Sequence, residues 1–544
     1  MTRTQRSTAR RNQSKAAARN TLAMRPTAAT YRLIAIAATV SLAAGAAAGA
    51  GSAYIIHRSS RAITNTGIIM NGNSNMGMGG GADTMNYDYT GSYTATLTAD
   101  ATEQTSDGET IESTTADQNA ALATNGGTLT IINGKLTKSG DSNNADNNNF
   151  YGTNSIALVV GDDSKAIISG STLSASSSGS NGVFATDSGT ALVYNTTIST
   201  TSDNSRALDA TYSGTILAGK VTADTQGDHS ATVATDRGGG NVSVVDSTLS
   251  TAGSGSPLLY STGDVQVSGV TGTATGAQIA GMEGYNTILI NDSTLESTNT
   301  DRTGSDPIAN GVIIYQSTSG DAESSTGEHA TFQAKDSTLK SAIESGAMFY
   351  FTNTTADVVL SNTTLDFDTS KATLINASGN DANNWGSAGS NGATVTFTGR
   401  NQTLEGDVTA DTISSVDLYL LDGTTWTGAA SITENSAASD SSTSDAPITV
   451  NVDGSSTWVV TEDTTISALN VASGGRIVDE NGDTVTIVAN GTTVVTGDSD
   501  VTVTVTGEYS TTVNAGSDTQ LADETIDRSE FDSQFGTSTS WTMA

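Results

Sequence analysis

The stretch Phe184-Ala-Thr-Asp-Ser-Gly-Thr-Ala-Leu-Val-Tyr-Asn-Thr-Thr-Ile198 returns in altered form as Val233-Ala-Thr-Asp-Arg-Gly-Gly-Gly-Asn-Val-Ser-Val-Val-Asp-Ser-Thr-Leu249, and 349–365 follows the same pattern. Each copy reads as a short strand, a Gly/Asp turn, a second alternating strand, an Asx turn and a closing apolar residue. A period of about 20–50 residues is typical of repeat proteins, whose units stack on one another. The sequence therefore predicts a solenoid rather than several globular domains.

The closing apolar residues set the length of the repeat, which is mostly 21–28 residues. Val, Ile and Leu alternate with Ser and Thr and lack a helical period, so each unit consists of strands and turns. We expect an all-β fold, a parallel β-helix (β-solenoid) with strands about 4.8 Å apart. The recurring Asp or Asn is expected to bond backbone amides in its turn and to form a ladder between coils. The closing positions are Leu136, Leu173, Ile198, Val221, Leu249, Val270, Leu295, Leu339 and Leu365.

Two spacings are longer than the rest, 37 residues before Leu173 and 44 residues before Leu339. Extra residues in a solenoid project as loops, here 139–155 and 318–329, often on the binding face. A tolerated surface insertion is the alternative interpretation. Because aromatic rings stack on sugar faces, Phe150 and Tyr151 are the candidate binding residues.

Charge is segregated along the chain. Residues 1–61 hold ten of the 23 basic residues and no acid, so the remainder carries 57 acids against 13 bases. Such a surface repels phosphate backbones, which argues against nucleic-acid binding by the main body. The chain has no cysteine, so disulfides and thiolate metal sites are excluded. No cofactor motif is present, and attraction of Ca²⁺ is only a secondary expectation.

The amino-terminal segment predicts export. After a basic cytoplasmic segment, 1–32, residues 33–56 form an uncharged stretch long enough to cross a bilayer as a helix. Basic residues on its amino-terminal side orient the body outward. A retained transmembrane anchor and a cleaved signal peptide both remain open. The predicted location is therefore extracellular or at the cell surface.

The rest of the chain divides by composition. We expect a Gly/Asn/Met-rich spacer at 57–93, a regular β-helix at 94–428 and a polar loop at 429–446. Irregular solenoid coils follow at 447–513, and 514–544 reads as an acidic tail or cap. The oligomeric state is not encoded in any motif.

The closing phrase, set in coils of 21–28 residues, resembles the right-handed parallel β-helix repeats of pectin-lyase-like proteins. The layout of export segment, spacer and Thr/Asn/Gly-rich solenoid resembles a bacterial surface adhesin or autotransporter passenger. The resemblance covers roughly Thr94 to Val513 and implies a right-handed parallel β-helix. It does not imply one activity, because the family contains both adhesins and polysaccharide-cleaving enzymes.

We expect an adhesin-like protein rather than an enzyme: a stiff rod that presents loops to glycans or to neighbouring cell surfaces. The alternative is a polysaccharide lyase or glycoside hydrolase of the same fold. The family's Gly-His-Gly, Arg-x-Lys and Asn-Thr-Asp motifs are missing, although Gly161-Asp162-Asp163 resembles part of the hydrolase pattern. His229 and His329 lie in turn-like sequence and are not expected to take part in catalysis, and His57 ends the apolar segment. A groove lined by acids and bases would favour an enzyme, and a plain polar rod an adhesin.

Overall fold

The computed structural model describes residues 86–317, 327–382, 385–439 and 443–544. They belong to one compact unit, 76–544, which is separate from the unit 1–75. The expected basic segment and the membrane or signal helix at 33–56 lie outside the described residues. Within the described part of the chain, no helix is long and apolar enough to cross a membrane.

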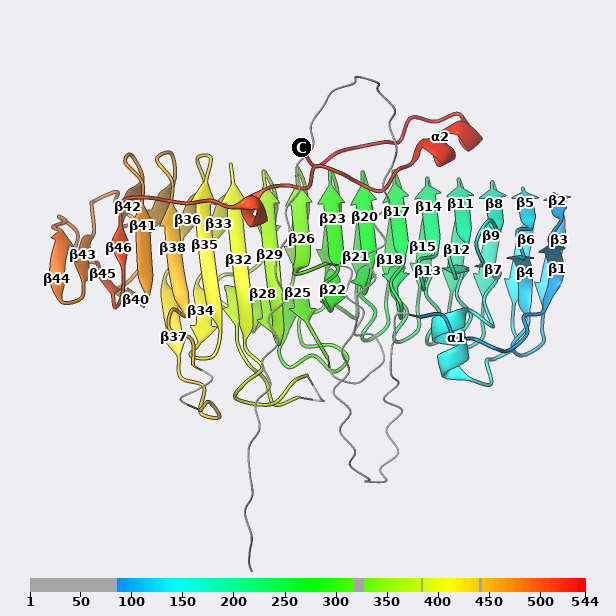
Figure 1. Ribbon diagram of the computed structural model, residues 1–544, viewed down its shortest axis with the longest axis horizontal. Coiled ribbons are helices and arrows are strands. Elements are labelled where there is room, and N and C mark those ends of the chain that lie inside the picture. The colour runs from blue at the N-terminus through cyan, green and yellow to red at the C-terminus, as the bar shows by residue number, and fades with distance from the viewer. Residues whose placement is uncertain (1–85, 318–326, 383–384, 440–442) are drawn as a thin grey trace, which may run out of the picture. The chain divides into compact units, whose positions relative to one another are not determined.

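The described residues form a parallel β-solenoid with coils that stack along one axis (Figure 1). All strand pairs are parallel except one hairpin near the end of the stack. The strands gather into five sheets, named A to E here.

Sheet A contains β1 (Ala95–Asp100), β4 (Asn119–Thr124), β7 (Ala157–Val160), β10 (Val183–Thr186), β13 (Leu208–Ala210), β16 (Val233–Thr235), β19 (Leu259–Ser261), β22 (Ala280–Glu283), β25 (Asn310–Tyr315), β28 (Ala347–Thr352), β31 (Thr373–Ala377), β34 (Val408–Asp411) and β37 (Ala430–Thr433). Sheet B contains β2 (Glu103–Asp107), β5 (Thr128–Ile132), β8 (Lys165–Ser169), β11 (Thr190–Tyr194), β14 (Thr215–Gly219), β17 (Asn241–Val245), β20 (Asp264–Ser268), β23 (Thr287–Asn291), β26 (Ala330–Lys335), β29 (Thr354–Ser361), β32 (Ala393–Arg400), β35 (Ser415–Leu421), β38 (Ile448–Val452), β41 (Ala468–Val471) and β46 (Tyr509–Ser510).

Sheet C contains β3 (Thr110–Ser113), β6 (Lys135–Lys138), β9 (Thr172–Ala175), β12 (Thr197–Thr200), β15 (Thr222–Thr225), β18 (Thr248–Thr251), β21 (Thr271–Ala274), β24 (Thr294–Ser297), β27 (Thr338–Ser341) and β30 (Thr364–Asp366). Sheet D contains β33 (Thr403–Glu405), β36 (Thr425–Thr427), β39 (Thr457–Val459) and β42 (Arg476–Val478). Sheet E contains β40 (Thr464–Ile466), β45 (Thr502–Val505), β43 (Thr486–Ala489) and β44 (Thr492–Val495). The helices are α1 (Ala145–Tyr151), α2 (Ser529–Phe535) and a 3₁₀ turn at Ser517–Thr519.

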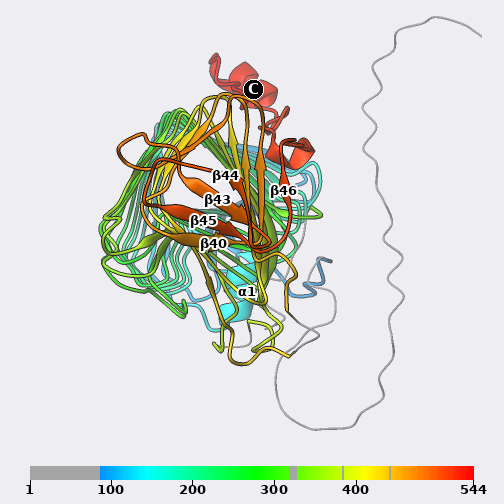
Figure 2. The ribbon, with the colours of Figure 1, turned by 90° about the vertical axis from the view of Figure 1, so that its left-hand side faces the viewer.

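The prediction of an all-β, repeated, parallel solenoid is confirmed by this topology. Sheet B, the longest, has 15 strands, one for each coil. The right-handed course of the coil stays a prediction. The antiparallel pair β43–β44 lies at the carboxyl-terminal end of the stack, which faces the viewer in Figure 2.

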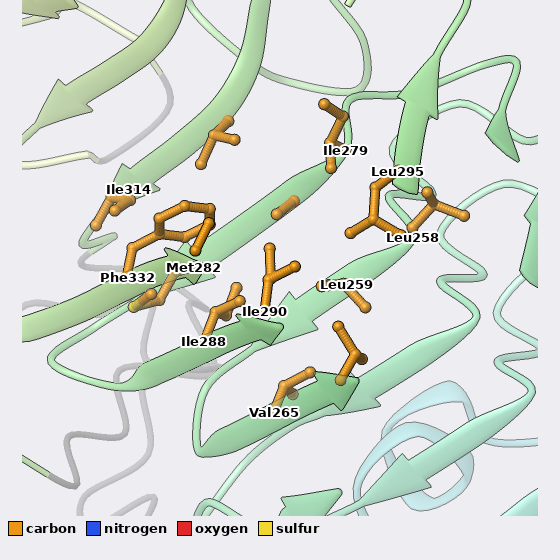
Figure 3. Close-up of a cluster of buried hydrophobic side chains, with 14 of the residues drawn as sticks. Leu258, Leu259, Val265, Ile279, Met282, Ile288, Ile290, Leu295, Ile314 and Phe332 are labelled. Atoms are coloured by element: carbon orange, nitrogen blue, oxygen red, sulfur yellow. The ribbon is translucent and has the colours of Figure 1, made fainter. Parts of the chain in front are cut away.

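The core is one continuous column of aliphatic side chains inside the coil. Residues at matching positions stack on one another, as Met282 and Ile314 do in two successive strands of sheet A (Figure 3). Each is inaccessible to solvent. Because every coil buries its apolar residues only against its neighbours, stability grows by stacking rather than by enlarging a globular core.

The strand register corrects two closing positions assigned from the sequence. Ile198 pairs with Ala223 in β15, and Leu249 pairs with Gly272 in β21. In these two looser copies, the closing position therefore lies two residues after Val221 and Val270, and a small residue occupies it. Sequence matching missed this because neither Ala nor Gly carries a strong apolar signal.

The closing phrase makes the turn between sheets B and C. Its first residue adopts a left-handed backbone, with φ of 48° at Asn195, 50° at Asp246 and 43° at Asp292. Asn, Asp and Gly tolerate this conformation best, which explains their recurrence. The side-chain ladder that we expected from this residue exists at Asn362, whose Nδ2 donates to Asp336 Oδ1 at 2.6 Å.

The second residue of the phrase provides a further bond between coils. Ser247 Oγ accepts from the backbone N–H of Val221 at 2.9 Å and donates to the carbonyl of Val245 at 2.7 Å. Ser293 does the same toward Val270 and Asn291. The buried turn amides are therefore satisfied by a column of hydroxyl groups.

Residues 511–544, here called the C-terminal strap, turn back along the outer face of sheet B (Figure 1). Gln333 Nε2 donates to the carbonyl of Gln520 at 3.0 Å, and Gln266 Oε1 accepts from the N–H of Ile526 at 2.8 Å. Further along, Phe531 packs on Leu192 and is fully buried. The segment expected as an acidic tail or cap thus covers a flank of the coil.

The strap explains why parts of sheet B are apolar on both faces. In β11, Ala191 and Val193 face the core, and Leu192 between them is buried under the strap. The segment expected as a polar loop at 429–446 also contains β37, which extends sheet A by one more strand.

Candidate functional site

A cleft of about 440 Å³ lies on the outer face of sheet A. Its floor is a row of residues in register, Tyr260 in β19, Gly281 in β22 and Ile313 in β25. The absence of a side chain at Gly281 leaves the space between its two larger neighbours. The volume of the cleft lies in the range typical of small-ligand sites.

Aromatic rings form one side of the cleft. The Tyr315 and Trp385 rings stack with centroids 4.0 Å apart and planes 18° apart. Trp385 is only 5% exposed, so it backs Tyr315 and holds its orientation. Tyr260 and Tyr315 remain half-buried and present the accessible aromatic surface.

Glu283 ends β22 inside the cleft and is held by three hydroxyl groups. Its Oε2 accepts from the Tyr260 hydroxyl at 2.9 Å and from the Tyr315 hydroxyl at 3.1 Å, and its Oε1 accepts from Ser317. Burial raises the pKa of Glu283 although these three bonds lower it. The carboxyl group of Glu283 is therefore fixed in place by three neutral donors.

The one guanidinium of the lining, Arg206, is already neutralised. Its Nη2 pairs with Asp236 Oδ2 at 2.9 Å, and its Nε lies 3.6 Å from Asp209 Oδ2. Its Nη1 also donates to Asn149 Oδ1 at 3.1 Å. Burial raises the pKa of Asp209 well above its usual range, and Arg206 counteracts this shift.

Asp306 is the third carboxyl group of the lining and sits in the long connection between β24 and β25. Its Oδ2 accepts from Asn310 Nδ2 at 2.9 Å. Burial raises the pKa of Asp306 to about 7, so its charge changes near neutral pH. It therefore differs from an ordinary surface aspartate, which stays ionised there.

Gln278 supplies an unused acceptor. It lines the cleft, is 5% exposed, and its Oε1 has no hydrogen-bond partner in the described part of the structure. A buried amide oxygen without a donor is costly, so this atom is poised to accept a bond from a bound molecule.

The predicted binding residues lie beside this cleft rather than on a projecting loop. The insertion forms α1, whose first turn is capped by Asn144 and whose end is closed by Gly152 with φ of 69°. Phe150 is 6% exposed, lines the cleft, and lies 3.7 Å beneath the Arg237 guanidinium. The structure thus brings Phe150 to the candidate site.

Tyr151 has a different environment. It is 8% exposed, and its ring stacks on Tyr89 and Tyr212 with centroids 5.0 and 5.5 Å away. These contacts tie residues of the expected spacer to the coil, together with Tyr87 and Tyr93. Stacking against two other rings leaves little of its surface for a sugar.

The histidines also fall in different places. His229 is exposed and lines the cleft, whereas His329 Nδ1 lies 2.8 Å from Asp357 Oδ2 on sheet B. His57 and most of the second insertion lie outside the described residues. Among the residues that the structure describes, no group of His, Cys, Asp and Glu is arranged to hold a metal ion.

Sequence reasoning missed Arg206, Tyr260, Glu283, Asp306 and Tyr315. Each comes from a different strand or connection, so no local motif joins them. The available signal was indirect: the coils with long spacings, which contain Phe150, Asp306 and Tyr315, both contribute to the cleft.

No family model matches this sequence, and no curated protein or solved structure is significantly similar to it. The pectin-lyase-like and adhesin resemblances therefore remain expectations. What the structure defines is the class, a parallel β-solenoid with a lateral cleft.

Proposed function

We propose that this protein is an exported, cell-surface β-solenoid that binds a glycan in the cleft on sheet A. The observation that supports the proposal is the combination of half-buried aromatic rings with fixed carboxyl and amide groups in one groove. Rings offer flat apolar surface to a sugar, and carboxylates accept hydrogen bonds from its hydroxyl groups. The expected adhesin activity is thus assigned to a groove rather than to loop tips.

The solenoid suits this role because it places the cleft on a regular scaffold. The residues of the floor come from adjacent strands whose positions are fixed by parallel pairing. Sites built on strands are held more firmly than sites on loops, which lowers the ordering cost of binding.

The first test is calorimetric titration of the protein with neutral and charged oligosaccharides. Tyr315→Ala should weaken binding by about tenfold or more, because it removes the stacking surface and one hydroxyl partner of Glu283. Tyr194→Ala is the matched control, since it removes an aromatic ring from sheet B. Equal loss in both variants, or none in Tyr315→Ala, would count against the cleft.

A polysaccharide-cleaving enzyme is the second candidate, favoured by the acid-lined groove that holds Glu283 and Asp306. It ranks second because the one guanidinium of that groove is already paired with Asp236. Burial raises the pKa of both Glu283 and Asp306, to about 7 for Asp306, and a carboxyl group with a raised pKa is a suitable general acid. The same oligosaccharides should then yield new reducing or unsaturated ends. Turnover lost in Glu283→Gln would favour the enzyme, and binding without turnover favours the binding protein.

A further inference from the structure

The carboxyl groups of the cleft outnumber its cations. Asp236, Glu283 and Asp306 line it, against one guanidinium, that of Arg206. Arg206 is committed to Asp236 and Asp209 by ion pairs. Glu283 is bonded to three hydroxyl groups, and Asp306 to one side-chain amide. The cleft therefore holds two carboxyl groups whose hydrogen bonds come from neutral hydroxyl and amide donors.

These two carboxyl groups lie near the same ring. Glu283 Oε2 accepts from the Tyr315 hydroxyl at 3.1 Å, and Asp306 lines the same cleft as this ring. An ammonium group seated beside Tyr315 would favour the ionised forms of these two carboxyl groups, because a nearby opposite charge lowers a raised pKa. It would also meet the aromatic faces of Tyr315 and Tyr260. Cations bind carboxylates and aromatic faces more strongly when water is excluded.

The buried acceptor of Gln278 independently indicates a ligand that carries hydrogen-bond donors, as neutral and amino sugars both do. Its Oε1 is buried and lacks a donor, and its Nε2 lies 3.5 Å from where a Cβ on Gly281 would stand. The amide thus lies over the cleft floor. A ligand that brings N–H or O–H donors satisfies it, whereas a ligand carboxylate brings only acceptors.

We propose that the cleft selects a glycan with free amino groups, an amino-sugar polymer, over neutral and anionic glycans. This inference rests on the proposed glycan-binding function and specifies its ligand class. Uronate-rich polysaccharides are disfavoured, because their carboxylates would face Glu283 and Asp306 on a body with 57 acids and 13 bases.

The test compares three oligomers of equal length: glucosamine, N-acetylglucosamine and galacturonate. Calorimetry at low salt should show the glucosamine oligomer binding about tenfold more tightly than its acetylated counterpart, the galacturonate oligomer binding weakest, and the preference shrinking as salt screens the charges. Equal or tighter binding of the acetylated oligomer overturns the inference. If that binding still depends on Tyr315, the proposed function survives.

Two variants separate specific recognition from general attraction to an acidic protein. Glu283→Gln and Asp306→Asn should each reduce the preference for the free amine while retaining the acetylated oligomer. The double change Glu103→Gln with Asp107→Asn removes two exposed acidic groups from β2, a strand that does not line the cleft. This control variant should retain the preference for the free amine. If the control reduces the preference as much as the cleft variants do, the cleft is not the amine site. Thermal melting of each variant verifies folding, and the wild-type comparison of the three oligomers stands without any variant.

Discussion

At the scale of single residues, the first two positions of the repeated phrase have different roles. Asp246 and its equivalents adopt the left-handed backbone of the turn, and Ser247 and its equivalents bond one coil to the next. Both residues were visible in the sequence. The ladder expected of the first residue exists at Asn362, but the bond made by the second residue was not expected, because pattern alone does not show which side chain points toward the neighbouring coil.

Ser247→Ala should lower the free energy of unfolding by about 1–3 kcal/mol, because it leaves the buried N–H of Val221 without an acceptor. Ser247→Thr keeps the hydroxyl group and matches Thr196 in another coil, so it should lose much less. Urea unfolding of the two variants measures the difference. Similar losses in both would mean that packing, not the hydrogen bond, determines the effect.

Asp306 makes the free energy of unfolding depend on pH, and the sign of this dependence follows from its burial. Its pKa is about 7 in the folded chain against an ordinary value of 3.8, so the folded state binds its proton more tightly. The associated stability is present below about pH 4 and is lost as pH rises through about 7. Asp306→Asn should therefore gain stability relative to wild type between about pH 4 and 8.

Urea unfolding at several pH values measures this difference directly. A constant difference between the two proteins across that range would show that Asp306 titrates normally, and the assigned cause of its shift would be wrong.

At the scale of elements, the strap and sheet B depend on each other. The guanidinium of Arg528 donates to the carbonyls of Ser243 and Ala218, at 2.8 and 2.9 Å, and lies over the Phe531 ring. Burial lowers the pKa of Arg528 to about 10, which still leaves it charged at neutral pH. Two Gln side chains bond the strap backbone, so its course is fixed by both polar and apolar contacts.

Phe531→Ala should destabilise the strap by about 3–5 kcal/mol, since the ring is fully buried against Leu192 and Leu217. Loss of the strap would expose these residues, so we expect earlier proteolysis within 511–544 as well as a lower melting temperature. Ser533→Ala, an exposed site in the same helix, is the control. Unchanged proteolysis would indicate that the strap is held mainly by its hydrogen bonds.

At the scale of the molecule, 15 coils at about 4.8 Å give a stack roughly 70 Å long. The cleft uses only some of them, between Asn149 in the first insertion and Trp385 in the connection after β31. Regular coils supply the floor, and the longer coils supply the walls. A solenoid can therefore gain a site by lengthening turns, without changing its core.

Local sequence patterns were sufficient to predict the parallel solenoid, its approximate period and most of its closing core positions. These features depend on alternation and on the tolerance of Asn, Asp and Gly for one backbone conformation, both of which are local properties. The sequence also pointed to the two coils with long spacings, and Phe150 from the first of them lines the cleft.

Only the tertiary structure decided the cleft and the course of the strap. Arg206, Glu283, Asp306 and Tyr315 meet because successive coils stack in register, and nothing local in the chain relates them. The strap likewise docks on residues up to 365 positions away, as Glu530 does on Lys165. Such contacts depend on which outward positions remain uncovered once the coil has formed, and that is a property of the assembled stack rather than of any segment.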